Sequence, residues 1–151
     1  MKSPSPRILI IDDNCDSYEL MQFMLQQANA GYEITCVSAS EEGLRLASAH
    51  RYDLYLLDYR MRGINGVEVC RRLRQTDAKT VIIFFTREAQ ESVRQEALRA
   101  GADAYLIKPD DLKQLTATVK RLLDMQKRTE RRDMSANDYS ANDYNASAMR
   151  D

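Results

Sequence analysis

The sequence predicts an α/β protein with a doubly wound parallel sheet that is covered by helices on both faces. Short, continuous apolar runs rich in β-branched residues recur along the chain, which is typical of strands buried on both sides. Amphipathic stretches with helical spacing separate these runs, so that strand and helix alternate five times. Right-handed crossovers would then place helices on both faces of one sheet.

The strands and helices follow one another in a regular order. The expected strands are Ile8–Ile11, Ile34–Val37, Leu54–Leu57, Val81–Phe85 and Ala104–Ile107. Apolar residues with helical spacing follow the first, third and fourth strands. Residues that favour helix starts precede the expected helices, at Asp16 and Ser17, Ser40 with Glu41 and Glu42, Asn65, and Asp110 with Asp111.

The composition changes after the last expected helix, which begins near Leu112 and reaches the basic segment Lys127–Arg132. Residues 135–144 read SANDY twice in tandem and contain no Val, Ile, Leu or Phe. Such a segment buries too little apolar surface to offset the entropy lost on ordering, so it is predicted to be disordered. The expected organisation is an N-terminal extension over residues 1–6, a folded domain over residues 7–127 and a polar, disordered tail over residues 128–151.

Composition excludes several classes of protein. The chain has 151 residues, of which 44% are hydrophobic, and this suits one domain with one core. The 22 Lys and Arg residues nearly balance the 23 Asp and Glu residues. The protein as a whole therefore has no large positive charge that would attract nucleic acid or an anionic membrane. The three cysteines are scattered and form no CxxC pair, which argues against a disulfide framework and a zinc site. No apolar run approaches the roughly 20 residues of a membrane span, and we expect a cytoplasmic protein.

Reactive side chains follow the predicted strands. Asp12 and Asp13 follow the first strand, Asp58 the third, Thr86 the fourth and Lys108 the fifth. Doubly wound sheets bind ligands outside the carboxyl ends of their strands, so these side chains are expected to converge. Neighbouring carboxylates repel unless a cation lies between them, and Mg²⁺ is the natural occupant. A carboxylate beside such an ion, with a lysine close by, can act as a nucleophile toward phosphorus.

The segments at these strand ends resemble a known family. IIDDN, LLDYRMRGINGVEV, FFT and GADAYLIKP, in this order, are similar to the receiver domains of bacterial response regulators in two-component signalling. The resemblance covers roughly residues 7–125. It implies a flavodoxin-like, chemotaxis-regulator-like fold, in which a five-stranded parallel sheet in the order 2-1-3-4-5 is flanked by five helices.

The resemblance also implies a phosphoacceptor site. Asp58 would accept a phosphoryl group from a histidine kinase or phosphotransfer protein in a Mg²⁺-dependent reaction. Asp12, Asp13 and Asp58 would hold the metal, with the backbone carbonyl of Arg60 as a further ligand. The domain would assist its own phosphorylation and dephosphorylation, and it would not be a turnover enzyme.

Further roles follow from the fourth and fifth segments. Lys108 would contact the phosphoryl oxygens and precede a cis peptide bond to Pro109. Thr86 and Tyr105 would form a switch pair, in which the hydroxyl moves to the phosphoryl group and the ring turns inward behind it. The output would be binding of a protein through the face built from the fourth helix, fifth strand and fifth helix. We expect no direct DNA binding, no membrane contact and no output domain within this sequence, and a homodimer is left open.

Three residues depart from the usual receiver pattern. Arg62 stands where proline usually follows methionine, so the loop after Asp58 is expected to be less rigid. Arg87 stands where a small residue usually follows the switch threonine, and it either crowds the phosphoryl approach or adds positive charge to it. Asp110 stands where phenylalanine often follows Lys-Pro, which makes the start of the last helix more polar.

Residues beside the site are expected to tune the lifetime of the phosphorylated state. Arg60 and Glu88 lie two positions beyond Asp58 and Thr86, carry opposite charges and would flank the path of water to the phosphorus. Together with Arg87 they form the expected rate-tuning set.

Other interpretations remain open. The aspartates taken singly suit solvated loop acids or a helix cap. A phosphatase with a covalent aspartyl intermediate would carry a second aspartate in a DxD pattern, whereas Tyr59 and Arg60 follow Asp58. A scaffold that keeps the fold without being phosphorylated is a third hypothesis. His50 and Cys15 are expected to be structural, and the basic residues of the last helix are expected to form a solvated face.

Overall fold

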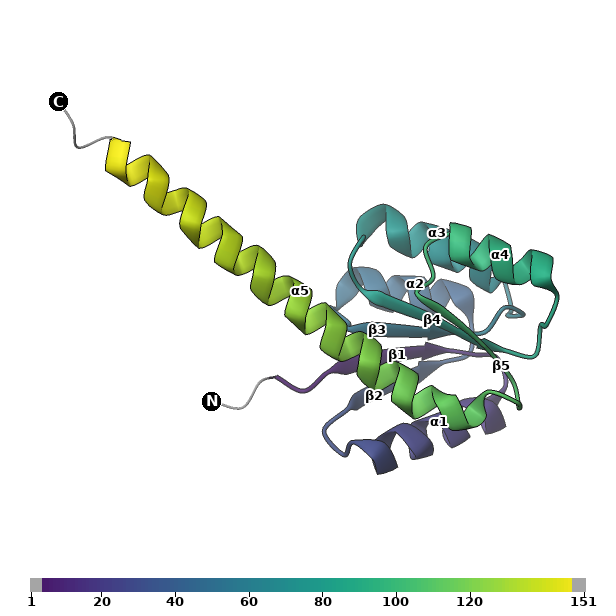
Figure 1. Ribbon diagram of the computed structural model, residues 1–151. Helices are drawn as coiled ribbons and strands as arrows, with labels where there is room; N and C mark the ends of the chain where they lie inside the picture. The colour runs from purple at the N-terminus through teal and green to yellow at the C-terminus, as the bar shows by residue number, and fades with distance from the viewer. Residues whose placement is uncertain (1–3, 148–151) are drawn as a thin grey trace.

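A parallel sheet lies between two layers of helices in the computed structural model, which describes residues 4–147 and the side chains up to residue 137 (Figure 1). The strands are β1 (Arg7–Ile11), β2 (Glu33–Val37), β3 (Leu54–Leu57), β4 (Val81–Thr86) and β5 (Ala104–Ile107). They are ordered β2-β1-β3-β4-β5, and every neighbouring pair is parallel. The predicted fold class and strand order are therefore confirmed.

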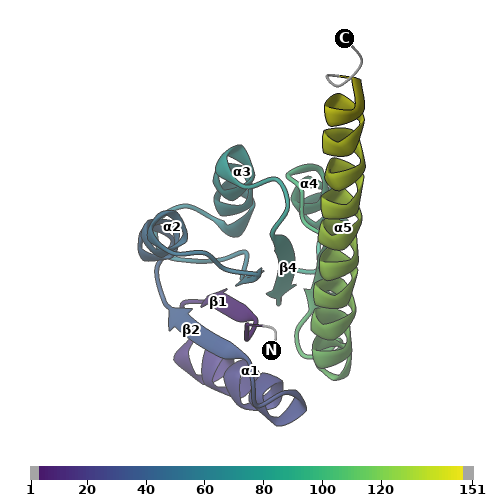
Figure 2. The same ribbon diagram turned by 90° about the vertical axis from the view of Figure 1, so that its left-hand side faces the viewer.

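The helices divide between the two faces of the sheet. They are α1 (Cys15–Ala28), α2 (Ser40–Ala49), α3 (Gly66–Thr76), α4 (Glu91–Arg99) and α5 (Leu112–Ser147). Helices α1 and α5 cover one face, and α2, α3 and α4 cover the other (Figure 2). This division follows from the strand order. The chain runs from β1 to β2 in one direction along the sheet and from β2 to β3, β4 and β5 in the other. Right-handed crossovers in opposite directions place their helices on opposite faces.

Helix α1 begins earlier than the sequence predicts. Asn14 is its N-cap, and the Asn14 side chain accepts a hydrogen bond from the Ser17 amide at 3.0 Å. Asparagine is as good an N-cap as aspartate or serine, and Asp16 lies in the first turn, where the helix dipole favours an acid. Asn65 caps α3 as predicted.

The core explains why the strands are continuous apolar runs. Alternate residues of β1 point to opposite faces, and Ile8, Leu9, Ile10 and Ile11 are each 0% exposed. Ile8 and Ile10 join the side chains of α1 and α5, whereas Leu9 and Ile11 join those of α2, α3 and α4. Both faces of β1 are excluded from water, so a polar side chain on either face of this strand would be buried.

Helix α5 differs from the predicted disordered tail. It continues without a break to Ser147, so residues 128–147 are helical and extend well beyond the sheet (Figure 1). No glycine or proline follows Pro109. A helix that is nucleated by its packed first half can therefore propagate, although residues 128–137 are exposed and contribute nothing to the core. Among the described residues, no helix is both long and apolar enough to span a membrane.

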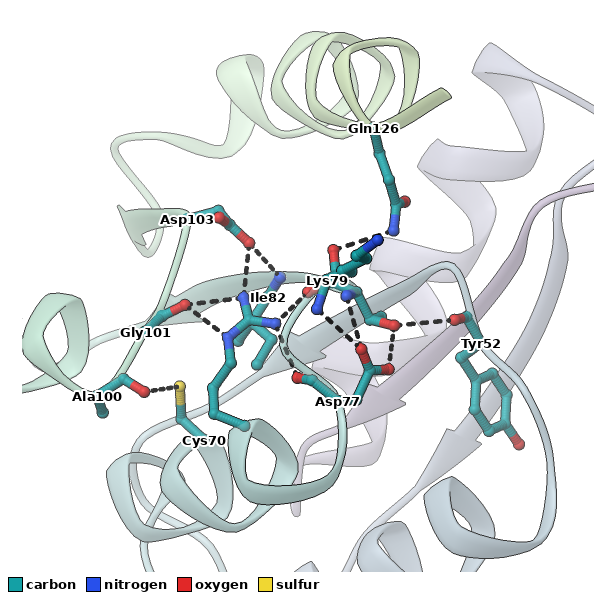
Figure 3. Close-up of polar contacts among 11 residues, drawn as sticks. Tyr52, Cys70, Asp77, Lys79, Ile82, Ala100, Gly101, Asp103 and Gln126 are labelled. Atoms are coloured by element: carbon teal, nitrogen blue, oxygen red, sulfur yellow. Dashed lines mark hydrogen bonds and ion pairs between the residues drawn. The ribbon is translucent and has the colours of Figure 1, made fainter. Parts of the chain in front are cut away.

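Arg74 of α3 joins the loops that precede β4 and β5. Its guanidinium donates to the carbonyl of Thr80 at 2.6 Å, to that of Gly101 at 2.8 and 3.0 Å, and to the Asp103 carboxylate at 3.0 Å. Asp103 also accepts from the Ile82 amide at 2.8 Å, and Gly101 and Asp103 face the same cluster in Figure 3. Gly101 has a φ of +110°, and a β-carbon added there would lie 2.9 Å from Arg74 Cγ. This cluster fixes the amino ends of β4 and β5, opposite the strand ends that carry the predicted site.

Candidate functional site

The carboxyl edge of the sheet brings the predicted acidic residues together. Asp12 and Asp13 follow β1 and Asp58 follows β3, and their carboxylate oxygens lie within 4.8 Å of one another. Asp12 is buried, Asp58 is partly buried and Asp13 is exposed. A set of carboxylate oxygens with no sulfur or imidazole ligand fits a hard divalent cation such as Mg²⁺.

Lys108 lies between two of these carboxylates. Its ammonium is 2.6 Å from Asp12 Oδ2 and 3.4 Å from Asp58 Oδ2, and its side chain is 10% exposed. Burial raises the pKa of Asp12 above its ordinary value, although the hydrogen bond from Lys108 acts in the opposite direction. One ammonium therefore offsets only part of the negative charge of three clustered carboxylates. The peptide bond between Lys108 and Pro109 is cis.

The Thr86 hydroxyl contacts the other oxygen of Asp58. Thr86, at the end of β4, is 1% exposed, and its hydroxyl donates to Asp58 Oδ1 at 2.6 Å. The Thr86 hydroxyl oxygen itself accepts from the Glu88 amide at 3.2 Å and from the Tyr59 amide at 3.4 Å. The two accepted bonds orient the hydroxyl proton toward Asp58, so both oxygens of this carboxylate meet a donor.

Tyr105 lies behind this threonine with its ring turned inward. The ring stacks on Phe84 at a centroid distance of 5.6 Å, and the residue is 9% exposed. Its hydroxyl donates to the Glu88 carbonyl at 2.5 Å. Burial, followed by the negative charge of Glu88, raises the pKa of Tyr105 to about 12. Thr86 and Tyr105 therefore contact the same residue, Glu88, from two neighbouring strands.

An ion pair crosses the mouth of the site. Arg60 Nη2 lies 3.2 Å from Glu88 Oε2, and the Arg60 side chain is 82% exposed whereas that of Glu88 is only 9% exposed. The pocket beside Asp58 has a volume of about 330 Å³. It is lined by Asp13, Asn14, Ser17, Asp58, Arg60, Thr86, Arg87, Glu88 and Lys108. The expected rate-tuning residues therefore all border the predicted phosphoacceptor.

Two residues that were not expected at the site from the sequence, Asn14 and Ser17, also line the pocket. Both lie at the start of α1, where the Asn14 cap turns the chain from the acidic pair into the helix. The signal was present in the sequence, because an asparagine directly after two aspartates and before an amphipathic stretch is a strong N-cap. Asp110, His50 and Cys15 do not line this pocket.

The fold and this constellation match one family. Residues 8–120 match the response regulator receiver domain, and the chain belongs to that family. It is 33% identical over 117 residues to the alkaline phosphatase synthesis transcriptional regulatory protein PhoP of Bacillus subtilis, which covers 78% of this chain and 48% of that protein. It is 33% identical over 120 residues to the response regulator ArlR of Staphylococcus aureus, which covers 80% of this chain and 53% of that protein. The chain thus spans about half the length of these curated relatives.

Solved structures agree with this assignment. A CheY-like response regulator receiver domain protein from Methanospirillum hungatei superposes with a TM-score of 0.77 at 28% identity, covering 82% of this chain and 98% of that one. The response regulator protein TrrA from Thermotoga maritima, in complex with Mg²⁺-BeF, superposes with a TM-score of 0.69 at 36% identity, covering 78% and 98%. The chain is therefore a receiver domain of the two-component response regulator family.

Proposed function

We propose that Asp58 accepts a phosphoryl group from a histidine kinase or phosphotransfer protein when Mg²⁺ is bound, and that this changes the conformation of the domain. The observation that carries the proposal is the environment of the Asp58 carboxylate. One oxygen meets Lys108 and the other meets Thr86, beside two further carboxylates. These donors orient the Asp58 carboxylate, which would act as the nucleophile toward phosphorus.

The residues of the site have distinct roles in this reaction, and Asp58 has two. An Asp58 oxygen attacks phosphorus, the P–N bond of the donor phosphohistidine breaks, and the imidazole leaves with the electron pair and takes up a proton. Asp12, Asp13, Asp58 and the Arg60 carbonyl would hold Mg²⁺, which neutralises charge on the transferring group. Lys108 holds the phosphoryl oxygens. The same alignment assists later attack by water, so the domain promotes both its own phosphorylation and its dephosphorylation.

The signal would leave the site through Glu88. Thr86 and Tyr105 both bond to the backbone of this residue, which lies just before α4. A phosphoryl group that draws the Thr86 hydroxyl would therefore shift the segment that Tyr105 holds. The partner is an output protein that binds the face formed by α4, β5 and α5, and the exposed basic residues of α5 are a solvated surface with no DNA-binding role.

Intact-mass analysis tests the proposal. The parent protein, incubated with phosphoramidate and Mg²⁺, is expected to gain the mass of one phosphoryl group and to gain none when EDTA replaces Mg²⁺. Asp58→Asn removes the nucleophile with little change in shape, and Asp16→Asn, on the exposed first turn of α1, is the matched control. Equal labelling of Asp58→Asn and the parent would refute the assignment of the acceptor.

Phosphate release and phosphoryl uptake test the two alternatives. A phosphatase would release inorganic phosphate from a phosphomonoester over many turnovers, but the residue two positions after Asp58 is Arg60, which cannot act as a general acid. A scaffold would take up no phosphoryl group from phosphoramidate or from any phosphohistidine donor.

A further inference from the structure

The loop between Asp58 and α3 carries the carbonyl that is proposed to bind the metal. At its start, the Tyr59 amide donates to the Thr86 hydroxyl at 3.4 Å, and at its end the Gly66 amide donates to the Tyr59 carbonyl at 2.8 Å. Gly66 packs so closely against the Asp58 carbonyl that an added β-carbon would collide with it. The ends of the loop are thus fixed, and its middle, from residue 60 to residue 64, needs a separate anchor.

Ser40 supplies this anchor from outside the loop. It is the first residue of α2 and is 0% exposed. Its hydroxyl donates to the Arg62 carbonyl at 2.7 Å and accepts from the Ile64 amide at 3.1 Å. Its own amide also donates to the Arg62 carbonyl at 3.3 Å, and Ala39 and Arg62 form an isolated parallel bridge. The buried Ser40 side chain therefore hydrogen-bonds to two backbone groups of a loop that is not part of the sheet.

The loop is shaped around this hydroxyl. Gly63 has a φ of +90°, and a β-carbon added there would lie 2.5 Å from Ser40 Oγ. The sequence predicts a less rigid loop because Arg62 replaces the usual proline. In the structure, hydrogen bonds from Ser40 hold the Arg62 carbonyl and the Ile64 amide of this loop.

We propose that Ser40 is a positioning residue of the metal site. It fixes the loop at residues 62 and 64, and this fixes the direction of the Arg60 carbonyl relative to the carboxylates of Asp12, Asp13 and Asp58. The inference rests on the proposed function, since it concerns the affinity of that site for Mg²⁺. Partners that orient metal ligands typically change metal affinity by about 10- to 100-fold when removed.

Two variants on the same helix separate this role from simple stability. Ser40→Ala removes both hydroxyl bonds to the loop. Ser48→Ala is the matched control, because the exposed Ser48 hydroxyl donates only to the Arg45 carbonyl of its own helix. Hydrogen exchange of the metal-free proteins is the first measurement, and the Ile64 amide is expected to exchange at least about tenfold faster in Ser40→Ala only.

Mg²⁺ binding by calorimetry is the decisive measurement. Ser40→Ala is expected to bind Mg²⁺ about tenfold more weakly than the parent and Ser48→Ala equally well. Phosphorylation of Ser40→Ala by phosphoramidate should return to the parental rate at saturating Mg²⁺, because the nucleophile and Lys108 are unchanged. If Ser40→Ala does not fold, Ser40→Cys, whose thiol bonds weakly, is measured in its place and should also bind Mg²⁺ more weakly than the parent.

The outcomes distinguish the two proposals. Faster exchange at Ile64 with an unchanged Mg²⁺ affinity would show that Ser40 only stabilises the loop, and would overturn this inference while leaving the proposed function intact. A parent protein that binds no Mg²⁺ would overturn the proposed function and this inference with it.

Discussion

Replacing Thr86 with alanine is expected to leave the chemistry intact and to abolish the switch. The substitution keeps Asp58, the other acids and Lys108 in place, so phosphoramidate should still label the protein. It removes the hydroxyl that lies 2.6 Å from Asp58 Oδ1 and that accepts from the Glu88 amide. We therefore expect Thr86→Ala to lose the coupling between phosphorylation of Asp58 and the conformation of the segment before α4.

The magnitude follows from the hydrogen bond. A bond to a charged group contributes about 1.5 to 3 kcal/mol, which corresponds to a roughly 10- to 150-fold change in a two-state equilibrium. A phosphoryl group biases the equilibrium only through contacts that differ between the two states. Since the Thr86 hydroxyl already contacts Asp58 Oδ1 here, the differential contact would be its bond to a phosphoryl oxygen, which only the phosphorylated protein offers. A mostly active phosphorylated population would therefore become mostly inactive.

Hydrogen exchange with and without phosphorylation measures this effect. In the parent, amides of α4 and of the Tyr105 segment should change their exchange rates on phosphorylation. In Thr86→Ala the change should be much smaller, and in Thr86→Ser, which keeps the hydroxyl, it should be near the parental value. A full response in Thr86→Ala would refute the route from Asp58 through Glu88 to the binding face.

Four further predictions follow from the described contacts. Arg60→Ala or Glu88→Ala should speed loss of the phosphoryl group, measured by intact mass over time, because the ion pair at the mouth opens; unchanged decay in both variants would remove the idea. Deleting residues 135–151 should leave the melting temperature and phosphorylation unchanged. The described ion pair between α5 and the loop before β4 involves Asp133, which lies outside the deleted segment. A large drop in melting temperature would show that the tail docks on the domain. Arg74→Met should lower the free energy of unfolding by about 3 kcal/mol in urea, because partly buried carbonyls lose a charged donor; a substitution of the exposed Arg72, Arg72→Met, is its control. Raising the pH above about 10 should lower the free energy of unfolding, because the pKa of Tyr105 is raised to about 12 and only the unfolded chain gains from ionisation there; a Tyr105→Phe variant should lose part of this dependence.

The sequence by itself determined the fold and most of the site. Continuous apolar runs require burial on both faces, and alternation with amphipathic stretches requires parallel strands joined by helices. The carboxyl ends of parallel strands share one edge, so Asp12, Asp58, Thr86 and Lys108 had to converge wherever the fold formed. These are consequences of chain direction, and local sequence is sufficient to derive them.

Only the tertiary structure decided which side chains serve that edge from other elements. Ser40 reads as a helix-start residue, and nothing local indicates that it holds a loop more than 20 residues away. The sequence indicates Glu88 as an oppositely charged neighbour of Arg60, with which it pairs, but nothing local indicates that its backbone joins Thr86 to Tyr105.

The same limit applies at the other end of the sheet and in the tail. Arg74 fixes Gly101 and Thr80 through carbonyl groups, which every residue possesses and no sequence pattern marks. Residues 128–137 are exposed, in keeping with the polar composition of the tail, but composition could not indicate their backbone conformation. A helix that starts on a packed surface propagates through local hydrogen bonds, so burial and helicity are decided by different forces.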